Sequence, residues 1–203
     1  MRIRKEEDVE KKKAEILAAA EELLKEEGLD QLSMRKVAER IHMTPGILYH
    51  YYENKEALLM EIVRNGYQEI LQLIQKSDVK GKQPDEAIYT VFYAYIGGML
   101  ERRELYTMLM NAQYPGISSQ TAMLYEGISK ERSSIQSLCQ QIERGKQQGL
   151  YVCEHVELRA QCIWCGVYGL LDRIIKEKVD GQQQERLIRE QLHMLIGSLR
   201  YVK

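Results

Sequence analysis

The sequence predicts an all-α protein, in which a small N-terminal domain precedes a larger helical domain. Residues that favour helix formation, such as Leu, Glu, Lys, Gln and Ala, are abundant, and only three prolines interrupt them. Apolar residues recur three and four positions apart over long stretches, which is the period of a helix with one buried face. The hydrophobic fraction of 44% in 203 residues is enough for a sizeable core.

Two helices are predicted first. One runs from about Val9 to Glu27, and Gly28 follows it, where a left-handed residue commonly ends a helix. The second begins after Ser33, whose hydroxyl is suited to cap a helix N-terminus.

A short third helix follows a break at residues 42–44. Thr44 is placed to cap this helix, and Pro45 occupies its first position, where a missing N–H costs nothing. Leu48 and Tyr52 are expected on its core side. Two short helices with so tight a connection have the size of a helix-turn-helix, whose second helix enters the DNA major groove.

The outer face of the third helix carries Gly46, Tyr49 and His50. Gly46 allows the backbone to come close to another surface, and the two rings offer hydrogen bonds and flat apolar area. A helix that faces only water usually carries charged residues there, so this face indicates a partner.

A fourth helix is predicted over 55–76, after Asn54, and connects the two domains, which we place at 1–55 and 56–203. Gly97 and Gly98 lie inside a later helix and allow either a kink or the close approach of a neighbour. The later helices are predicted over 85–102, 104–112, 119–148, 156–178 and 183–200.

Charge alone does not indicate DNA binding. The chain has a net charge of −1, and its first 57 residues hold 11 Lys and Arg against 13 Asp and Glu. Binding must therefore depend on where the charges lie. Lys55 is in the first turn of its helix, where a cation opposes the helix dipole by roughly 0.3–1 kcal/mol, so we expect an anion as its partner.

Three segments resemble the tetracycline repressor (TetR) family. They are ILAAAEEL at 16–23, SMRKVA at 33–38 and TPGILYHYYENKEAL at 44–58. The resemblance covers about residues 12–60, and the remainder agrees only in its helical pattern. It implies a three-helix helix-turn-helix domain that binds an operator in double-stranded DNA, and a C-terminal domain for a small effector and for dimerisation.

Individual contacts are implied by the resemblance. The base-reading position is Arg35, the groove-facing positions are Pro45, Gly46 and Tyr49, and the phosphate contacts are Ser33, Thr44, His50 and Lys55. The basic residues at 2–5 and 11–13 add contacts from an N-terminal arm or form a solvated face. One position departs from the family, which usually has glycine where this chain has His42. Histidine enters the left-handed region more readily than most residues, so we expect the turn to be kept.

The segment 88–114 is rich in Tyr and Met, which suit an irregular cavity for a mostly apolar ligand with a few hydrogen-bonding groups. A plain core stripe is the alternative for each single residue. The resemblance implies an effector site here, and we expect it to be lined by Tyr89, Phe92, Tyr93, Met99, Tyr106, Met110, Trp164 and Tyr168.

The last two predicted helices carry a stripe of small residues and an apolar stripe. The resemblance implies that they form a four-helix interface in a homodimer, which would span the half-sites of a palindromic operator. The alternative is burial within one subunit. The expected interface residues are Cys162, Cys165, Gly166, Gly169, Ile188, Leu192, Leu195 and Leu199.

Cys162 and Cys165, with Cys153 and His155, suggest a redox pair or a metal site, but buried thiols also act as small apolar residues. We expect no metal, no cofactor and no enzymatic activity, because no nucleophile, acid–base or phosphate-binding motif is present. The sequence has no apolar run near 18 residues and no signal-peptide pattern, so we expect a cytoplasmic protein with reduced cysteines.

Two functions remain. The first is a repressor that a small, mostly apolar effector releases from its operator. The second is a helical ligand-binding protein whose DNA-binding module has lost its function, which the acidic N-terminal balance suggests. The salt dependence of DNA binding discriminates between them.

Overall fold

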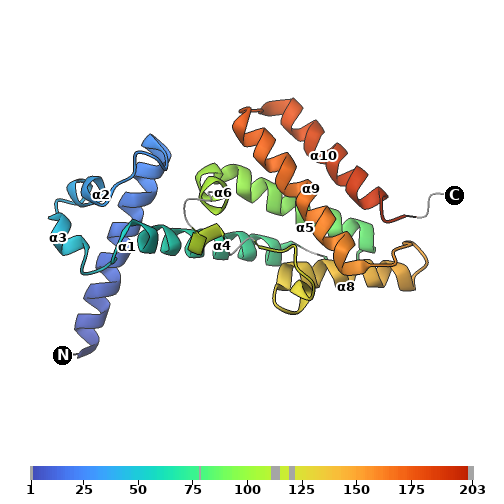
Figure 1. Ribbon diagram of the computed structural model, residues 1–203, viewed down its shortest axis with the longest axis horizontal. Coiled ribbons are helices and arrows are strands. Elements are labelled where there is room, and N and C mark those ends of the chain that lie inside the picture. Colours follow the sequence, from blue (N-terminus) through green and yellow to red (C-terminus); the bar gives the residue numbers. More distant parts are fainter. Residues whose placement is uncertain (1, 78, 111–114, 119–121, 201–203) are drawn as a thin grey trace. The chain divides into compact units, whose positions relative to one another are not determined.

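The computed structural model describes residues 2–77, 79–110, 115–118 and 122–200 (Figure 1). These residues form helices joined by loops, with a 3₁₀ turn at Ile128–Lys130 and no β-strand in the described ranges, so the all-α prediction is confirmed. The helices are α1 (Arg2–Glu27), α2 (Met34–Arg40), α3 (Pro45–Leu48), α4 (Lys55–Lys76), α5 (Pro84–Glu101), α6 (Arg103–Leu109), α7 (Pro115–Ser118), α8 (Ser133–Gln147), α9 (Val156–Lys176) and α10 (Gly181–Gly197). None of the described helices is long and apolar enough to cross a membrane.

The chain packs into two compact units. The first unit comprises residues 1–69 and 104–121, and the second comprises residues 70–103 and 122–203. Helix α4 therefore contributes to both units. This division differs from the domain boundary after residue 55 that the sequence suggests. That boundary stays a prediction about where the DNA-binding domain ends.

In the first unit, α1 packs on α2, and α2 packs on α3. Ile16, Val37 and Leu48 are fully buried among these helices. Two predicted boundaries are confirmed: the Ser33 hydroxyl accepts a hydrogen bond from Lys36 N (3.2 Å), and Gly28 ends α1 with a φ of 84°. Helix α1 begins at Arg2, earlier than expected, so the backbone of the supposed N-terminal arm is already helical.

The turn between α2 and α3 depends on His42, which has a φ of 53°. Met43 N donates to Ala38 O (2.8 Å), and His42 N donates to Glu39 O (3.2 Å). This pair of bonds is a Schellman motif, in which a left-handed residue ends the helix and satisfies its last carbonyl groups. The expectation that His42 keeps the turn of the family is confirmed.

In the second unit, α5 is the central helix and packs against α8, α9 and α10 (Figure 1). Its apolar character on every side follows from this position, because a helix surrounded by others has little need of a polar face. Gly98 of α5 marks a close approach, since a Cβ there would lie 2.7 Å from Ile70 Cδ1 and 3.0 Å from Leu73 Cδ2. The sequence allowed either a kink or a close approach of a neighbouring helix at Gly97 and Gly98, and at Gly98 the structure shows the close approach.

Helices α9 and α10 also pack closely. A Cβ at Gly166 would lie 2.8 Å from Leu195 Cδ2, and Gln191 Nε2 donates to Gly166 O (3.3 Å). Small residues at this point allow two neighbouring helices of one protomer to meet.

The helix expected over 119–148 is wrong in its first part. Residues 122–127 are not helical and α8 begins only at Ser133, while 119–121 lie outside the described residues. Helix α9 explains the difference, because its side chains bind this backbone. Glu157 accepts hydrogen bonds from Gly127 N (2.8 Å) and Ser129 N (2.9 Å), and Gln161 Nε2 donates to Met123 O (2.8 Å).

Candidate nucleic-acid interface

Helix α3 has one buried side and one exposed side. Leu48 is fully buried and Tyr52 is 6% exposed, which confirms the predicted core side. Burial also raises the pKa of Tyr52 to about 12, so this phenol stays neutral. On the other side Ile47 is 45% exposed and Tyr49 is 51% exposed. This side of α3 therefore presents apolar and aromatic side chains to solvent.

The exposed side begins at Thr44 and Pro45, and it continues through Gly46 and His50, which are also exposed. Thr44 occupies the N-cap position with an extended backbone, but its side chain makes no capping hydrogen bond. The expected cap is therefore made by the backbone alone. Within the described part of the chain, Gly46 has no neighbouring atom within 4 Å of a Cβ built on it, so no described contact requires glycine at this position.

Arg35 lies on α2 with its side chain 81% exposed. Its Nε donates to Glu39 Oε1 (2.7 Å), and this hydrogen bond raises the pKa of the guanidinium above its usual value. The bond occupies Nε and leaves the two terminal nitrogens for another acceptor. A guanidinium that presents two parallel donors matches the O6 and N7 acceptors of guanine. The analysis of the sequence missed Glu39, although its spacing of four residues from Arg35 was the available signal.

The other cations of α2 are bound to α1. Arg40 pairs with Glu26 (2.5 Å) and Glu22 (3.4 Å), and Lys36 pairs with Glu27 (2.5 Å). The hydrogen bond from Arg40 lowers the pKa of Glu26. Part of the acidic excess of this domain is therefore used to hold α2 against α1, away from the exposed side of α3.

Lys55 begins α4, and Asn54 caps this helix by accepting a hydrogen bond from Ala57 N (2.8 Å). Lys55 Nζ donates to Leu29 O (3.0 Å), in the loop that follows α1. A backbone carbonyl is thus one partner of the ammonium group in addition to the expected anion, and the phosphate contact stays a prediction. Lys55 thus connects the start of α4 to the end of α1, and any contact with phosphate would be additional.

Comparison with known proteins agrees with this geometry. The family described as "Bacterial regulatory proteins, tetR family" matches residues 16–62, which contain α2, the turn at His42, α3 and the start of α4. Residues 16–62 therefore form an N-terminal domain of the TetR family type. The HTH-type transcriptional regulator UidR of Escherichia coli (strain K12) is 35% identical over 78 residues, which are 38% of this chain and 36% of UidR. The chain thus matches only about a third of the length of this curated relative.

Solved structures extend the likeness of fold over nearly the whole chain. A TetR-family transcription regulator from Marinobacter aquaeolei VT8 has a TM-score of 0.63 at 22% identity, covering 98% of this chain and 100% of that one. FadR of Thermus thermophilus, a TetR-family repressor in complex with lauroyl-CoA, has a TM-score of 0.64 at 16% identity, covering 94% and 96%. At these identities the likeness shows the fold alone.

The residues expected to line an effector site do not all converge. Phe92, Trp164 and Tyr168 form one aromatic cluster in the second unit, and Met99 of that unit is fully buried. Tyr93 is 37% exposed, and its hydroxyl bonds to Glu185. Tyr106 and Met110 belong to the first unit, where Tyr106 is buried and Met110 is half-buried.

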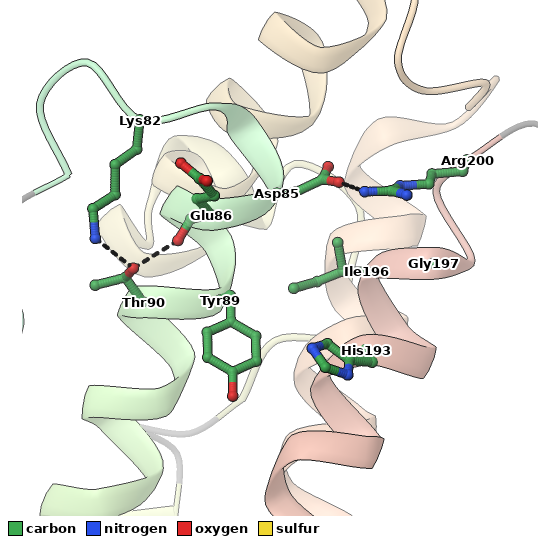
Figure 2. Close-up of a pocket in the computed structure, with 9 residues that line it drawn as sticks. All are labelled: Lys82, Asp85, Glu86, Tyr89, Thr90, His193, Ile196, Gly197 and Arg200. Carbon is green, nitrogen blue, oxygen red and sulfur yellow. Dashed lines mark hydrogen bonds and ion pairs between the residues drawn. The ribbon is translucent and has the colours of Figure 1, made fainter.

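Tyr89 lies in a different place, a groove of about 620 Å³ between α5 and α10. Figure 2 shows Tyr89 of α5 facing His193 of α10 across this groove, with ring centroids 5.5 Å apart. An ion pair between Asp85 and Arg200 closes one end. At the other end Lys82 Nζ donates to Thr90 Oγ (3.0 Å). Charged side chains, namely Lys82, Asp85, Glu86 and Arg200, contribute to the lining, so the groove differs in character from the expected lining of aromatic and Met side chains.

The residues expected at a dimer interface fall into two groups. Ile188, Leu192 and Leu199 are buried within the protomer and turn toward its own core. Cys162, Cys165 and Gly169 lie on the exposed face of α9, whereas Gly166 and Leu195 contact each other between α9 and α10. The sequence analysis missed two further exposed residues of these helices, Leu158 and Met194, each 58% exposed. In the described ranges no group of His, Cys, Asp and Glu is arranged to hold a metal ion.

A substitution at Gly46 tests whether the α3 face meets a partner. In Gly46→Ala the new methyl group points into open space, so we expect the free energy of unfolding to stay unchanged or to rise by about 0.5–1 kcal/mol. DNA binding should nevertheless weaken by about 10-fold or more, because the methyl group blocks close approach of the backbone. Thermal melting and fluorescence anisotropy measure the two effects.

Gly97→Ala is the matched control, since this glycine is also helical with open space at its Cβ but lies on α5. It should alter stability in the same direction and leave DNA affinity unchanged. Unchanged DNA affinity of Gly46→Ala would show that the backbone of α3 does not approach DNA.

Proposed function

We propose that this chain is a sequence-specific DNA-binding transcriptional regulator that acts as a repressor. The main observation in support of this proposal is the exposed side of α3. It presents Tyr49 and Ile47 to solvent, it has an open Gly46, and it lies inside the domain that matches the TetR family. A helix of this size on a helix-turn-helix enters the major groove, where its side chains reach base edges.

The proposed roles follow from the position of each residue. Arg35 reads a base through its terminal nitrogens, while Pro45, Gly46 and Tyr49 lie against the groove. Ser33, Thr44, His50 and Lys55 contact phosphates, which position the protein without reading sequence.

We further propose that a small, mostly apolar effector in the second unit releases the protein from its operator. Helix α4 is the element for this coupling, because it contributes residues 55–69 to the first unit and 70–76 to the second. The likeness to FadR, which was solved with lauroyl-CoA, supports a fold able to hold a ligand with an apolar chain. Linkage requires that effector and DNA weaken each other's binding by the same factor.

The protein acts as a homodimer in this proposal. Leu158 of α9 and Met194 of α10 are large apolar side chains in solvent, and Cys162, Cys165 and Gly169 on the same face of α9 are exposed as well. A symmetric dimer through these two helices would cover them and would present two copies of α3 to a palindromic operator.

A salt titration tests DNA binding directly. Operator DNA selected from a random pool should bind with an affinity that falls steeply with salt, by about 0.9 logarithmic units per phosphate neutralised for each tenfold rise in salt. Tyr49→Ala should weaken binding to every sequence. Arg35→Ala should cost about 1–3 kcal/mol at one base pair and relax the preference there.

Tyr125→Ala is a suitable control, because Tyr125 is another exposed tyrosine but lies in the second unit. Its DNA affinity should equal that of the unmodified protein. Binding that is weak and independent of sequence would instead favour a ligand-binding protein whose DNA-binding module has lost its function.

Effector release is tested with compounds that bind the second unit. A compound that raises the melting temperature of the protein should weaken operator binding, and operator DNA should weaken the binding of that compound by an equal factor. Calorimetric titrations with and without DNA measure both factors. If every compound that binds leaves DNA affinity unchanged, the coupling is refuted.

The dimer is tested by placing a charge on the exposed face. Met194→Glu should shift sedimentation from dimer to monomer, because a buried unpaired carboxylate is costly at an apolar interface. Leu150→Glu places the same charge at an exposed leucine outside α9 and α10, and it should leave the dimer intact. A Met194→Glu variant that sediments as the unmodified protein does would exclude this face.

A further inference from the structure

The single tryptophan of the chain, Trp164, has a buried polar atom that no described residue hydrogen-bonds. Trp164 is 5% exposed, and its indole Nε1 has no hydrogen-bond partner among the described residues. An indole N–H is a donor only. Buried polar groups in folded proteins are nearly always paired, so this N–H calls for a physical explanation.

Aromatic rings surround the indole. Phe92 and Tyr95 of α5 meet it edge to face, with ring centroids 4.8 Å and 5.0 Å away and interplanar angles of 67° and 85°. Tyr168, one turn further along α9, lies 5.5 Å away at 34°. Rings in such arrangements favour contact with another ring or flat apolar group.

One side of this aromatic cluster is open. Phe92 and Tyr95 are each 2% exposed, whereas Tyr168 is only half-buried, so the cluster reaches solvent beside Tyr168. The four described rings carry no positive charge. These rings therefore offer an anionic ligand no ion pair in exchange for its lost hydration, while a neutral acceptor loses far less.

We propose that the effector is a neutral, ring-containing, mostly apolar compound with an oxygen acceptor, and that Trp164 Nε1 donates a hydrogen bond to that oxygen. This inference rests on the proposed function, because it assigns the chemistry of the effector bound in the second unit. The surrounding ring faces offer the N–H at most a weak contact. A carbonyl or ether oxygen placed beside the indole gains a full hydrogen bond, and Tyr168 moves aside to admit the ligand.

Acetophenone and α-methylstyrene are the probes. They have nearly the same shape, but the carbonyl oxygen of the first is replaced by a CH₂ group in the second. Because the chain has one tryptophan, a ¹H–¹⁵N spectrum contains one indole signal, which reports directly on this N–H. Acetophenone should move the indole proton downfield and bind about 5–10-fold more tightly than α-methylstyrene.

Trp164→Phe should remove this preference, so that both compounds bind equally. Tyr151→Phe is the matched control, because it removes a donor from another buried ring of the same unit, one that bonds to Asp85. It should keep the preference. If Trp164→Phe fails to fold, the indole signal of the unmodified protein still decides.

An indole signal that does not move at saturating acetophenone, or equal binding of the two probes to the unmodified protein, would overturn the inference. Trp164 would then be a core residue whose N–H points at a ring face. Neither result would alter the salt-dependent binding of operator DNA. Loss of that binding would instead refute the proposed function, which keeps the two failures distinguishable.

Discussion

The exposed side of α3 depends on one left-handed residue, His42. The bond from Met43 N to Ala38 O ends α2 and turns the chain, so that Pro45 starts a new helix in a different direction. Leu48 then points into the core, and Tyr49 points out of it. A residue other than glycine in this region costs about 1–2 kcal/mol. The two hydrogen bonds of the Schellman motif offset that cost by pairing carbonyl groups that the end of α2 would otherwise leave open.

Several of the charged side chains in the first unit form ion pairs that hold its helices together. Glu22, Glu26 and Glu27 of α1 bind cations of α2, and so they hold the helix-turn-helix against α1. These pairs are partly exposed, so each contributes little to stability by itself. Their effect is to fix geometry. A formal charge counted over the whole domain therefore says little about the surface that α2 and α3 present.

Local features of the fold could be predicted from the sequence, because neighbouring residues decide them. Ser33 and Asn54 cap helices through amide groups three residues away, and Gly28 and His42 end helices by their own φ angles. The segment before α8 could not be predicted in this way. Its backbone is bound by Glu157 and Gln161, which lie 28 to 38 residues further along the chain.

In the candidate sites, too, local positions could be predicted from the sequence, but contacts between distant residues could not. The positions of Thr44, Gly46, Tyr49 and His50 on the exposed side follow from helical periodicity. Periodicity also places Ile188 and Leu192 on one face of α10, but it cannot say whether that face meets the same chain or a second copy. Lys55 is a further case, because its partner is a carbonyl in a loop 26 residues earlier.

Helix α5 supplies a physical route from the aromatic cluster to α4. Phe92 and Tyr95 contact Trp164, and Gly98, less than one turn beyond Tyr95, lies directly against Ile70 and Leu73 at the end of α4. Since close-packed interiors transmit small displacements, a ligand that separates Trp164 from these rings would move α5 against that end of α4. The glycine makes the contact tight, because the Ile70 and Leu73 side chains lie directly against the α5 backbone at Gly98. Helix α4 is continuous to Lys55, whose ammonium group holds the loop after α1, so the same helix ends within the DNA-binding unit.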